Sequence, residues 1–238
     1  MTPPRHPLIN HKLDLLRRAA GGQRAIVFGD MYKVDGFYSR SLLGMGFSRV
    51  VLVDLVETAR WLAHRLEAPA LDFYKGDFAD PLFMASIREH FDLGVAFDVL
   101  LHQANLLQTL HHMASKVDRL CIVQPMIEER AEPATVVYLP GNGATPLLHP
   151  CGADSPLPNP VDVVDAGHWI WAATPSFLRH AMAGEGFQVV HEARFEALPN
   201  PSWFWWGCIA DRGRGPVTQW SRTPRQPGLF PASWPDQE

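Results

Sequence analysis

Short apolar runs alternate with amphipathic segments through the first half of the chain. Such runs, each four to seven residues long and bounded by turn residues, occur at 25–28, 50–53, 70–74, 91–97 and 119–123. Runs of this length are typical of strands that are buried on both faces of a parallel sheet. The segments between them repeat their apolar residues at helical spacing. The pattern therefore predicts successive βα units and an α/β fold with a doubly wound sheet.

The amphipathic segments predict helices at 9–19, 36–46, 56–66, 80–90 and 98–113. Several of these segments carry end signals. Asp80 precedes Pro81, the order expected for an N-cap residue and a proline in the first helical turn. Gly44 and Gly46 can adopt the left-handed conformation that ends a helix.

The second half of the chain differs in composition. Residues 126–165 contain ten prolines and glycines, and within them only 135–139 has the pattern of a strand. Long segments of this kind are usually lids or binding loops. A helix is predicted from Thr174-Pro175 to Ala183, followed by strands at 187–195 and 203–210. We expect one domain over residues 1–210, a proline-rich lid insertion at about 126–170 and a flexible tail at 211–238.

Composition and charge limit the classes of function. The 238 residues carry a net charge of −4, which does not provide the basic surface of a tight nucleic-acid-binding protein. No apolar run approaches the length of a membrane span, and the N-terminus lacks a signal-peptide core. Cys121, Cys151 and Cys208 lie far apart, which favours reduced thiols over a disulfide or a zinc site. We therefore expect a cytoplasmic protein with a small-molecule substrate and no metal; the oligomeric state is left open.

Residues 25–54 have the layout of a βαβ unit that binds a nucleoside cofactor. Asp54 closes the second strand, 18 positions after Gly36 (54 − 36), about where such units place a ribose-binding carboxylate. A carboxylate offers two acceptor oxygens to the two hydroxyls of a ribose. The alternative for Asp54 is an ordinary turn residue at the end of a strand.

Over about residues 20–210 the chain resembles the class I S-adenosylmethionine-dependent methyltransferases. That family has an acidic residue at the end of its first strand, then a G-x-G-x-G turn, and an acidic residue at the end of its second strand. Asp30, Gly36 and Asp54 match these positions, and the phrase DGFYS at 35–39 occurs in several subgroups. Tyr32 and Val34 replace the first two glycines of the turn.

The resemblance implies a Rossmann-like, seven-stranded sheet with one antiparallel strand, and S-adenosylmethionine as the cofactor. It assigns cofactor contacts to Asp30, Tyr32, Gly36, Asp54, Leu55, Asp77, Phe78 and Phe97. Asp30 would meet the methionine ammonium, for which an exposed loop aspartate is the alternative. Asp77 would bind the adenine amino group, with Phe78 against the ring. His102, in the phrase VLLH, would either structure the site or act as a general base.

Aromatic residues next to the insertion predict the acceptor side of the site. His168, Trp169 and Trp171 precede the Thr174 helix, and in an extended segment the two tryptophans would share one face. They would form a flat wall for an aromatic or heterocyclic acceptor, or else pack against the sheet. Tyr38 is also assigned to the acceptor.

The leading interpretation is a methyltransferase acting on a small organic acceptor. Two alternatives stay open. One is a methyltransferase-like fold that has lost methyl transfer and serves as a binding subunit or catalyses another reaction. The other is a relative of the tRNA-modifying enzymes.

Overall fold

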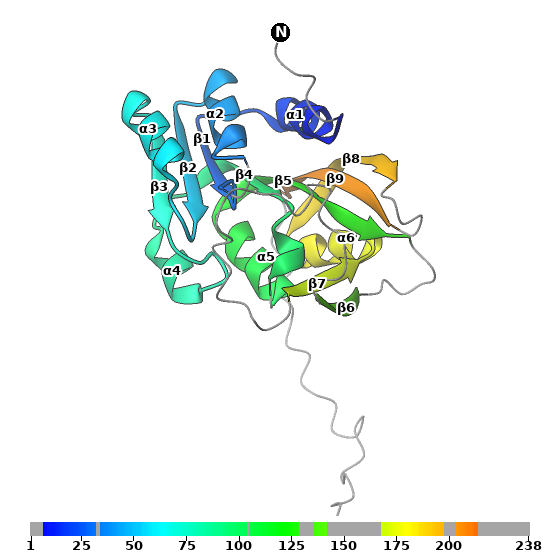
Figure 1. Cartoon of the computed structure of the whole chain (residues 1–238). Helices are drawn as coiled ribbons and strands as arrows, with labels where there is room; N and C mark the ends of the chain where they lie inside the picture. Colours follow the sequence, from blue (N-terminus) through cyan, green and yellow to red (C-terminus); the bar gives the residue numbers. More distant parts are fainter. Residues whose placement is uncertain are drawn as a thin grey trace, which may run out of the picture.

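The computed structural model describes residues 7–31, 34–103, 105–128, 136–141, 168–197 and 203–213; the side chains of 136–141, 168–172, 196–197 and 203 are not described. A seven-stranded sheet forms the centre of the molecule (Figure 1). Its strands are β1 (Arg24–Phe28), β2 (Arg49–Asp54), β3 (Leu71–Lys75), β4 (Phe91–Phe97), β5 (Val117–Ile127), β8 (Phe187–Ala197) and β9 (Trp203–Arg212).

The strand order is β3-β2-β1-β4-β5-β9-β8. The first five strands pair in parallel, and β9 runs antiparallel to both of its neighbours, β5 and β8. This order confirms the predicted α/β, doubly wound, seven-stranded sheet with one antiparallel strand. A separate two-stranded antiparallel sheet is formed by β6 (Val136–Gly141) and β7 (His168–Ala173).

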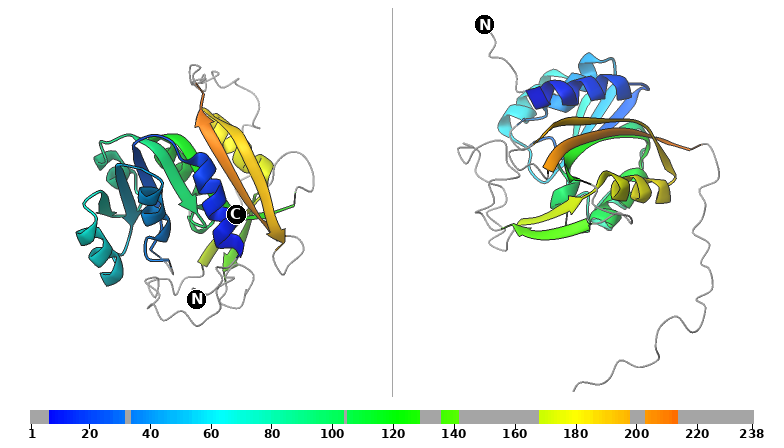
Figure 2. Two further views of the ribbon diagram at one scale, coloured as in Figure 1. Left: turned by 90° about the horizontal axis from the view of Figure 1, so that it is seen from above. Right: turned by 90° about the vertical axis from the view of Figure 1, so that its right-hand side faces the viewer.

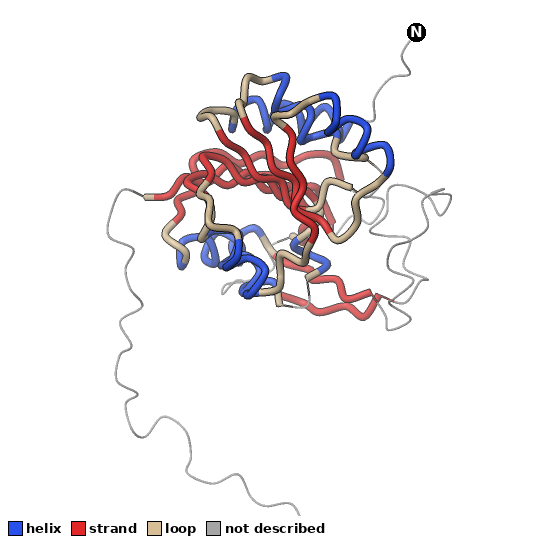
Figure 3. The backbone as a smooth tube through the Cα atoms, turned by 90° about the vertical axis from the view of Figure 1, so that its left-hand side faces the viewer, coloured by secondary structure: helices blue, strands red, loops and turns tan. Residues whose placement is uncertain are grey.

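Helices cover both faces of the main sheet (Figure 3). On one face lie α1 (Pro7–Ala19), α2 (Phe37–Gly44) and α3 (Ala59–Glu67). On the other lie α4 (Pro81–Ser86), α5 (Leu106–Ala114) and α6 (Pro175–Gly184). Each strand contributes to both layers because successive side chains point to opposite faces. In β1, for example, Val27 joins the first core and Ile26 the second.

Several element boundaries differ from the predicted ones. The helix predicted to reach residue 90 ends at Ser86, because Ile87 adopts an extended conformation. The helix predicted at 98–113 is split into a 3₁₀ turn, η1 (Leu100–His102), and α5, which Asn105 caps by accepting from the Gln108 N–H. Helix α3 begins at residue 59, after its N-cap Thr58.

Other predictions concern the insertion and the tail. β9 extends through Arg212, so residues 211 and 212 belong to the sheet, where Arg119 pairs with Asp211. The remaining tail, and most of the predicted lid insertion, fall outside the described residues. No helix in the described part of the chain is long and apolar enough to cross a membrane.

Two of the three cysteines are buried free thiols, as predicted. Cys121 belongs to the core on one face of the sheet and Cys208 to the core on the other, so the sheet separates them. Burial raises the pKa of both thiols, which keeps them protonated and unreactive. Cys151 lies outside the described residues.

Candidate functional site

The strand order creates a switch point between β1 and β4. The chain moves outward from β1 through β2 to β3 and then returns to β4, on the other side of β1. In open α/β sheets, ligands bind in the crevice at the carboxyl ends of the strands at such a point. The residues to consider here are those that follow Phe28, Val53 and Phe97.

Backbone hydrogen bonds, one of them to β2, hold the turn after β1. The Gly29 N–H donates to the Val53 carbonyl (2.9 Å), and the Gly36 N–H donates to the Asp30 carbonyl (2.7 Å). Asp35 and Gly36 both have positive φ, 46° and 70°. Within this turn, Tyr32 and Lys33 lie outside the described residues, so the assignment of Tyr32 to the cofactor stays a prediction.

Gly36 is required by the protein's own packing. A Cβ atom at this position would lie 2.1 Å from Cε3 of Trp61, which projects from α3 and is fully buried. The positive φ adds a second reason for glycine. This glycine therefore serves close packing of α3 against the turn, and a contact with a cofactor stays a prediction.

Asp54 is the last residue of β2 and contacts the turn that follows β1. Its Oδ2 accepts from the Met31 N–H (3.1 Å), and its Oδ1 accepts from the Leu55 N–H (2.7 Å). The residue is half-buried, and burial raises the pKa of its carboxyl above the usual value. Because the two carboxylate oxygens have about four lone pairs between them, the carboxylate keeps acceptor capacity for a ligand. Backbone hydrogen bonds thus fix the orientation of the carboxylate that the sequence assigned to a ribose.

Asp30 is buried and caps helix α2. Its Oδ2 accepts from the Ser39 N–H (2.7 Å) and the Ser39 hydroxyl (2.8 Å). The helix begins after Gly36, which has no side chain to satisfy the first N–H groups, and Asp30 supplies this acceptor. Burial, partly opposed by the Ser39 hydrogen bonds, raises the pKa of Asp30 to about 7.

The second oxygen of Asp30 has a different environment. Oδ1 is buried and has no hydrogen-bond partner among the described residues. A buried acceptor of this kind suits a cationic donor such as an ammonium. The exposed loop position considered from the sequence is wrong, because Asp30 is only 2% exposed. Its predicted contact with the methionine ammonium stays a prediction.

The residues after β2 and β3 form the outer part of this edge. Leu55 is 56% exposed and Val56 38%, so two apolar side chains face solvent directly after Asp54. Asp77 is exposed and accepts from the Ala79 N–H (2.8 Å). Phe78 is buried and packs edge-on against Phe28, with ring centroids 5.8 Å apart. Phe78 thus packs in the core next to the end of β1. Its predicted contact with adenine stays untested.

Phe97 and Tyr38 pack against each other next to the end of β4. Their ring centroids lie 4.8 Å apart in an edge-to-face arrangement, and both residues are buried. The ammonium of Lys12, from α1, lies near both rings and pairs with Asp98. The assignments of Phe97 to the cofactor and of Tyr38 to the acceptor stay predictions, and Lys12 and Asp98 join the candidate site.

The strand that carries the predicted acceptor residues lies next to the turn that carries His102. β7 lies against η1, the turn that ends at the exposed His102. Trp169 pairs with Pro140 and Trp171 with Tyr138 in the β6–β7 ladder, so the segment is extended and the two tryptophans share one face. The side chains of His168, Trp169 and Trp171 lie outside the described residues, so the predicted wall is untested.

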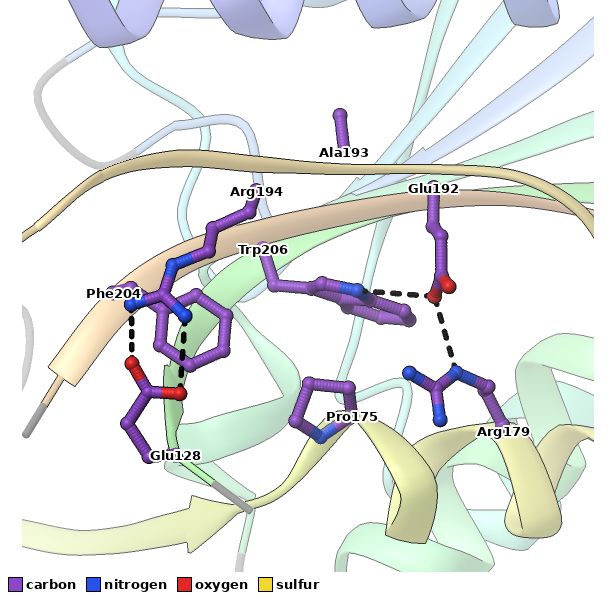
Figure 4. Close-up of a pocket in the computed structure, with 8 residues that line it drawn as sticks. All are labelled: Glu128, Pro175, Arg179, Glu192, Ala193, Arg194, Phe204 and Trp206. Atoms are coloured by element: carbon purple, nitrogen blue, oxygen red, sulfur yellow. Dashed lines mark hydrogen bonds and ion pairs between the residues drawn. The ribbon is translucent and has the colours of Figure 1, made fainter.

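A cleft of about 330 Å³ lies next to the two ends of the insertion. It is lined by Glu128, Pro175, Arg179, Glu192, Ala193, Arg194, Phe204 and Trp206 (Figure 4). Arg194 forms a two-fold ion pair with Glu128 and lies 4.0 Å from the centre of the Phe204 ring. Arg179 and the Trp206 indole N–H both donate to Glu192. Because strands are spaced about 4.8 Å apart, this cleft over β8 and β9 lies apart from the switch point.

Comparison with known proteins identifies the fold. No family model matches the sequence, and no curated protein resembles it in sequence at a significant level. The structure of 1,6-didemethyltoxoflavin-N1-methyltransferase from Burkholderia thailandensis, with 1,6-didemethyltoxoflavin and S-adenosylhomocysteine bound, is similar, with a TM-score of 0.61. The two sequences are 16% identical, and the match covers 87% of this chain and 78% of that one.

Two further solved structures extend the comparison. Magnesium protoporphyrin IX methyltransferase from Synechocystis, with S-adenosylhomocysteine bound, has a TM-score of 0.54 and 15% identity, over 90% of each chain. The (4+2)-cyclase SpnF has a TM-score of 0.59 and 10% identity, over 87% of this chain and 81% of its own. The chain therefore has the fold of the class I S-adenosylmethionine-dependent methyltransferases.

Some residues of the site were not singled out from the sequence. Lys12, Ser39, Trp61 and Asp98 belong to this group. Lys12 had a detectable signal, because it interrupts a helical stripe of apolar residues, and Asp98 had one as the first residue after an apolar run. Ser39 and Trp61 had no such signal, since their roles depend on contacts between separate elements.

Proposed function

We propose that the protein is a methyltransferase that uses S-adenosylmethionine and acts on a small organic acceptor. The observation that carries this proposal is the Asp54 carboxylate at the end of β2. It is fixed by the N–H groups of Met31 and Leu55 and keeps acceptor capacity for a ligand. Its position beside the switch point is where this fold places a ribose-binding acid.

The surrounding residues fit the same cofactor. The exposed Leu55 and Val56 offer an apolar surface next to Asp54, suited to a flat purine. The buried Oδ1 of Asp30, which has no hydrogen-bond partner among the described residues, suits an ammonium group. Together, these features match the diol, the aromatic ring and the charged end of S-adenosylmethionine.

The reaction requires little chemistry from the side chains. When bound, the cofactor supplies an electrophilic methyl group. The protein has to hold the acceptor atom in line with that methyl group and exclude water. Where the acceptor must lose a proton, His102 is the candidate base, because it is exposed near the end of β4 and lies beside β7.

The acceptor is proposed to lie between the end of β4 and the β6–β7 pair. Trp169 and Trp171 occupy one face of β7, and an aromatic face of this kind binds flat heterocycles well. The toxoflavin and porphyrin methyltransferases with the same fold act on heterocyclic compounds, according to their names. An aromatic or heterocyclic acceptor is therefore proposed.

A second function is supported by one specific similarity. SpnF shares the fold and is a (4+2)-cyclase, so this architecture also serves reactions other than methyl transfer. Replacement of two turn glycines by Tyr32 and Val34 is consistent with that alternative. Such a protein would serve as a binding subunit or catalyse another reaction, without transferring a methyl group.

Asp54→Asn tests the proposed site. The change keeps the shape of the side chain but removes the charge, and a hydrogen bond to a charged group contributes about 1.5–3 kcal/mol. We expect the affinity for S-adenosylhomocysteine, measured by calorimetry, to fall at least about tenfold. Asp118→Asn is the matched control, because Asp118 is an exposed carboxylate near the start of β5. It lies at the amino ends of the parallel strands, away from the carboxyl ends where Asp54 lies. Equal affinities in the two folded variants would contradict the ribose assignment.

A further inference from the structure

Lys12 occupies a core position on helix α1. The helix crosses the sheet over β5 and β9 (Figure 2), with Leu8, Leu15, Leu16 and Ala19 on its buried face. Lys12 lies on the same face and is only 5% exposed. A lysine at such a position is unusual, because burial of an ammonium is unfavourable unless a partner compensates for the lost water.

The partner of Lys12 is Asp98. The Lys12 ammonium pairs directly with Oδ2 of Asp98. Three aromatic rings surround the same ammonium, with centroids at 5.8 Å for Tyr38, 5.8 Å for Phe97 and 5.1 Å for Trp205. Ring faces attract cations, so the ammonium is held by one carboxylate and by aromatic faces from three different elements.

Asp98 lies at the switch point of the sheet. It follows β4 directly, and β4 is the neighbour of β1, whose end leads into Gly29 and Asp30. Its backbone is left-handed, with φ of 60°, a conformation that non-glycine residues adopt at some energetic cost. The side chain is 33% exposed, whereas that of Lys12 is 7% exposed. Asp98 thus lies nearer the surface than Lys12 at the end of β4, although its Oδ1 is buried.

Stability alone gives no reason for this arrangement. The desolvation of a buried ion pair commonly cancels the attraction between its charges, and apolar residues of similar volume often serve as well or better. The pair nevertheless lies among the buried apolar residues of α1, next to the end of the strand where a ligand would bind. A role in the chemistry of the site is therefore the more economical explanation.

We propose that Lys12 and Asp98 form a charge-balanced pair that faces the reacting centre, with Lys12 as a positioning residue for Asp98. This inference rests on the proposed function. In methyl transfer, the acceptor's lone pair forms the new bond to carbon and the sulfur keeps the electron pair of the broken bond. The positive charge leaves the sulfur with the methyl group, and an acceptor that must lose a proton gives it to His102 or to water.

The charge of the pair determines how this step is affected. A carboxylate without Lys12 beside it would stabilise the positive sulfonium of the bound cofactor. In the transition state this positive charge is spread over more atoms, so the carboxylate would stabilise it less. The carboxylate would therefore raise the barrier and slow the transfer. Lys12 cancels that charge and holds the carboxylate in one orientation. Asp98 can then accept a hydrogen bond in a fixed direction, while its negative charge is neutralised by Lys12.

The test compares two ligands that differ in charge. S-Adenosylmethionine carries the sulfonium, and S-adenosylhomocysteine is its counterpart with a neutral sulfur. Lys12→Met removes the positive charge next to Asp98, so the ratio of affinities should shift toward S-adenosylmethionine by about tenfold, the order of one partly screened charge. Asp98→Asn leaves Lys12 unbalanced and should shift the ratio in the opposite direction. The double variant should return to the wild-type ratio.

Controls separate this role from a structural one. Asparagine tolerates the left-handed conformation of position 98, and methionine preserves the length of the Lys12 side chain. Leu15→Ala is the matched control, because it weakens the packing of α1 without changing any charge. It should lower stability and leave the affinity ratio unchanged, and circular dichroism checks that each variant is folded.

The outcomes distinguish this inference from the proposed function. Opposite shifts in the two single variants support the pair. Unchanged ratios, or shifts in the same direction, overturn the pair while the proposed function stands. If the wild-type protein binds neither compound, the proposed function fails, and the inference that rests on it fails too.

Discussion

Gly36 and Trp61 are so close that a Cβ atom on the glycine would lie 2.1 Å from the indole ring. The contact joins the turn after β1 to helix α3, which follows β2. The contact therefore determines how the turn after β1 and helix α3, which both lie next to Asp54, are placed relative to each other. The packing of Trp61 and the geometry of the candidate cofactor site are linked through this glycine.

Gly36→Ala should destabilise the protein by about 2–4 kcal/mol, since overpacking costs about 1–3 kcal/mol and the left-handed φ adds about 1 kcal/mol or more. Urea unfolding measures this change. Gly44→Ala is the control, because a Cβ at Gly44 meets no other atom within 4 Å. That variant should be neutral or slightly stabilised. Equal stabilities for the two variants would show that the contact with Trp61 is relaxed in solution.

The buried Asp30 should make stability depend on pH. Its pKa is about 7 in the folded protein and 3.8 for the ordinary group, and burial is the main cause of the difference. Between these two values the folded state binds more protons than the unfolded state. The contribution of Asp30 to stability should therefore fall as the pH rises from about 4 to 7, by up to about 1.4 kcal/mol per pH unit.

Asp30→Asn resembles the neutral acid and should remove this dependence. The measurement is urea unfolding at pH values between 5 and 8, with the difference between variant and wild type as the result. The variant should gain relative stability as the pH rises. Asp14→Asn is the control, since Asp14 is exposed on α1. Parallel profiles for Asp30→Asn and the wild type would show that Asp30 is charged throughout this range.

The tryptophans of β7 are predicted to serve the acceptor and not the cofactor. Trp169→Ala and Trp171→Ala should therefore change the affinity for S-adenosylhomocysteine by less than about twofold, or 0.4 kcal/mol. Binding of an aromatic acceptor should weaken by more, because a buried aromatic face contributes about 0.5–1.5 kcal/mol beyond its area. Calorimetry with S-adenosylhomocysteine checks the first expectation directly. A large loss of affinity there would place the two side chains on the cofactor side.

The sequence predicts the main sheet well because its signals are local. Runs such as 50–53 and 91–97 are largely apolar on both faces of the strand. A doubly wound sheet is one of the few folds that bury both faces of a strand. Helix limits are harder to predict. The early end at Ser86 and the interruption before Asn105 result from backbone conformations that the apolar spacing does not reveal.

The candidate site is predictable only where it follows the strands. Asp54 could be identified because the end of an apolar run marks its position. Asp30 could be placed but its environment could not, since its partner Ser39 lies on a helix that first has to dock. The pairing of Lys12 with Asp98, 86 residues apart, depends on how α1 crosses the sheet.

The most direct test of the central claim is a calorimetric titration of the wild-type protein with S-adenosylhomocysteine. One molecule should bind per chain, with a dissociation constant of about 100 µM or below, equivalent to about 5.5 kcal/mol of binding free energy. Such a result would show that the altered turn between Asp30 and Gly36 still admits the cofactor. Absence of saturable binding at millimolar concentrations would contradict the methyltransferase assignment, and the fold would then have to serve another ligand.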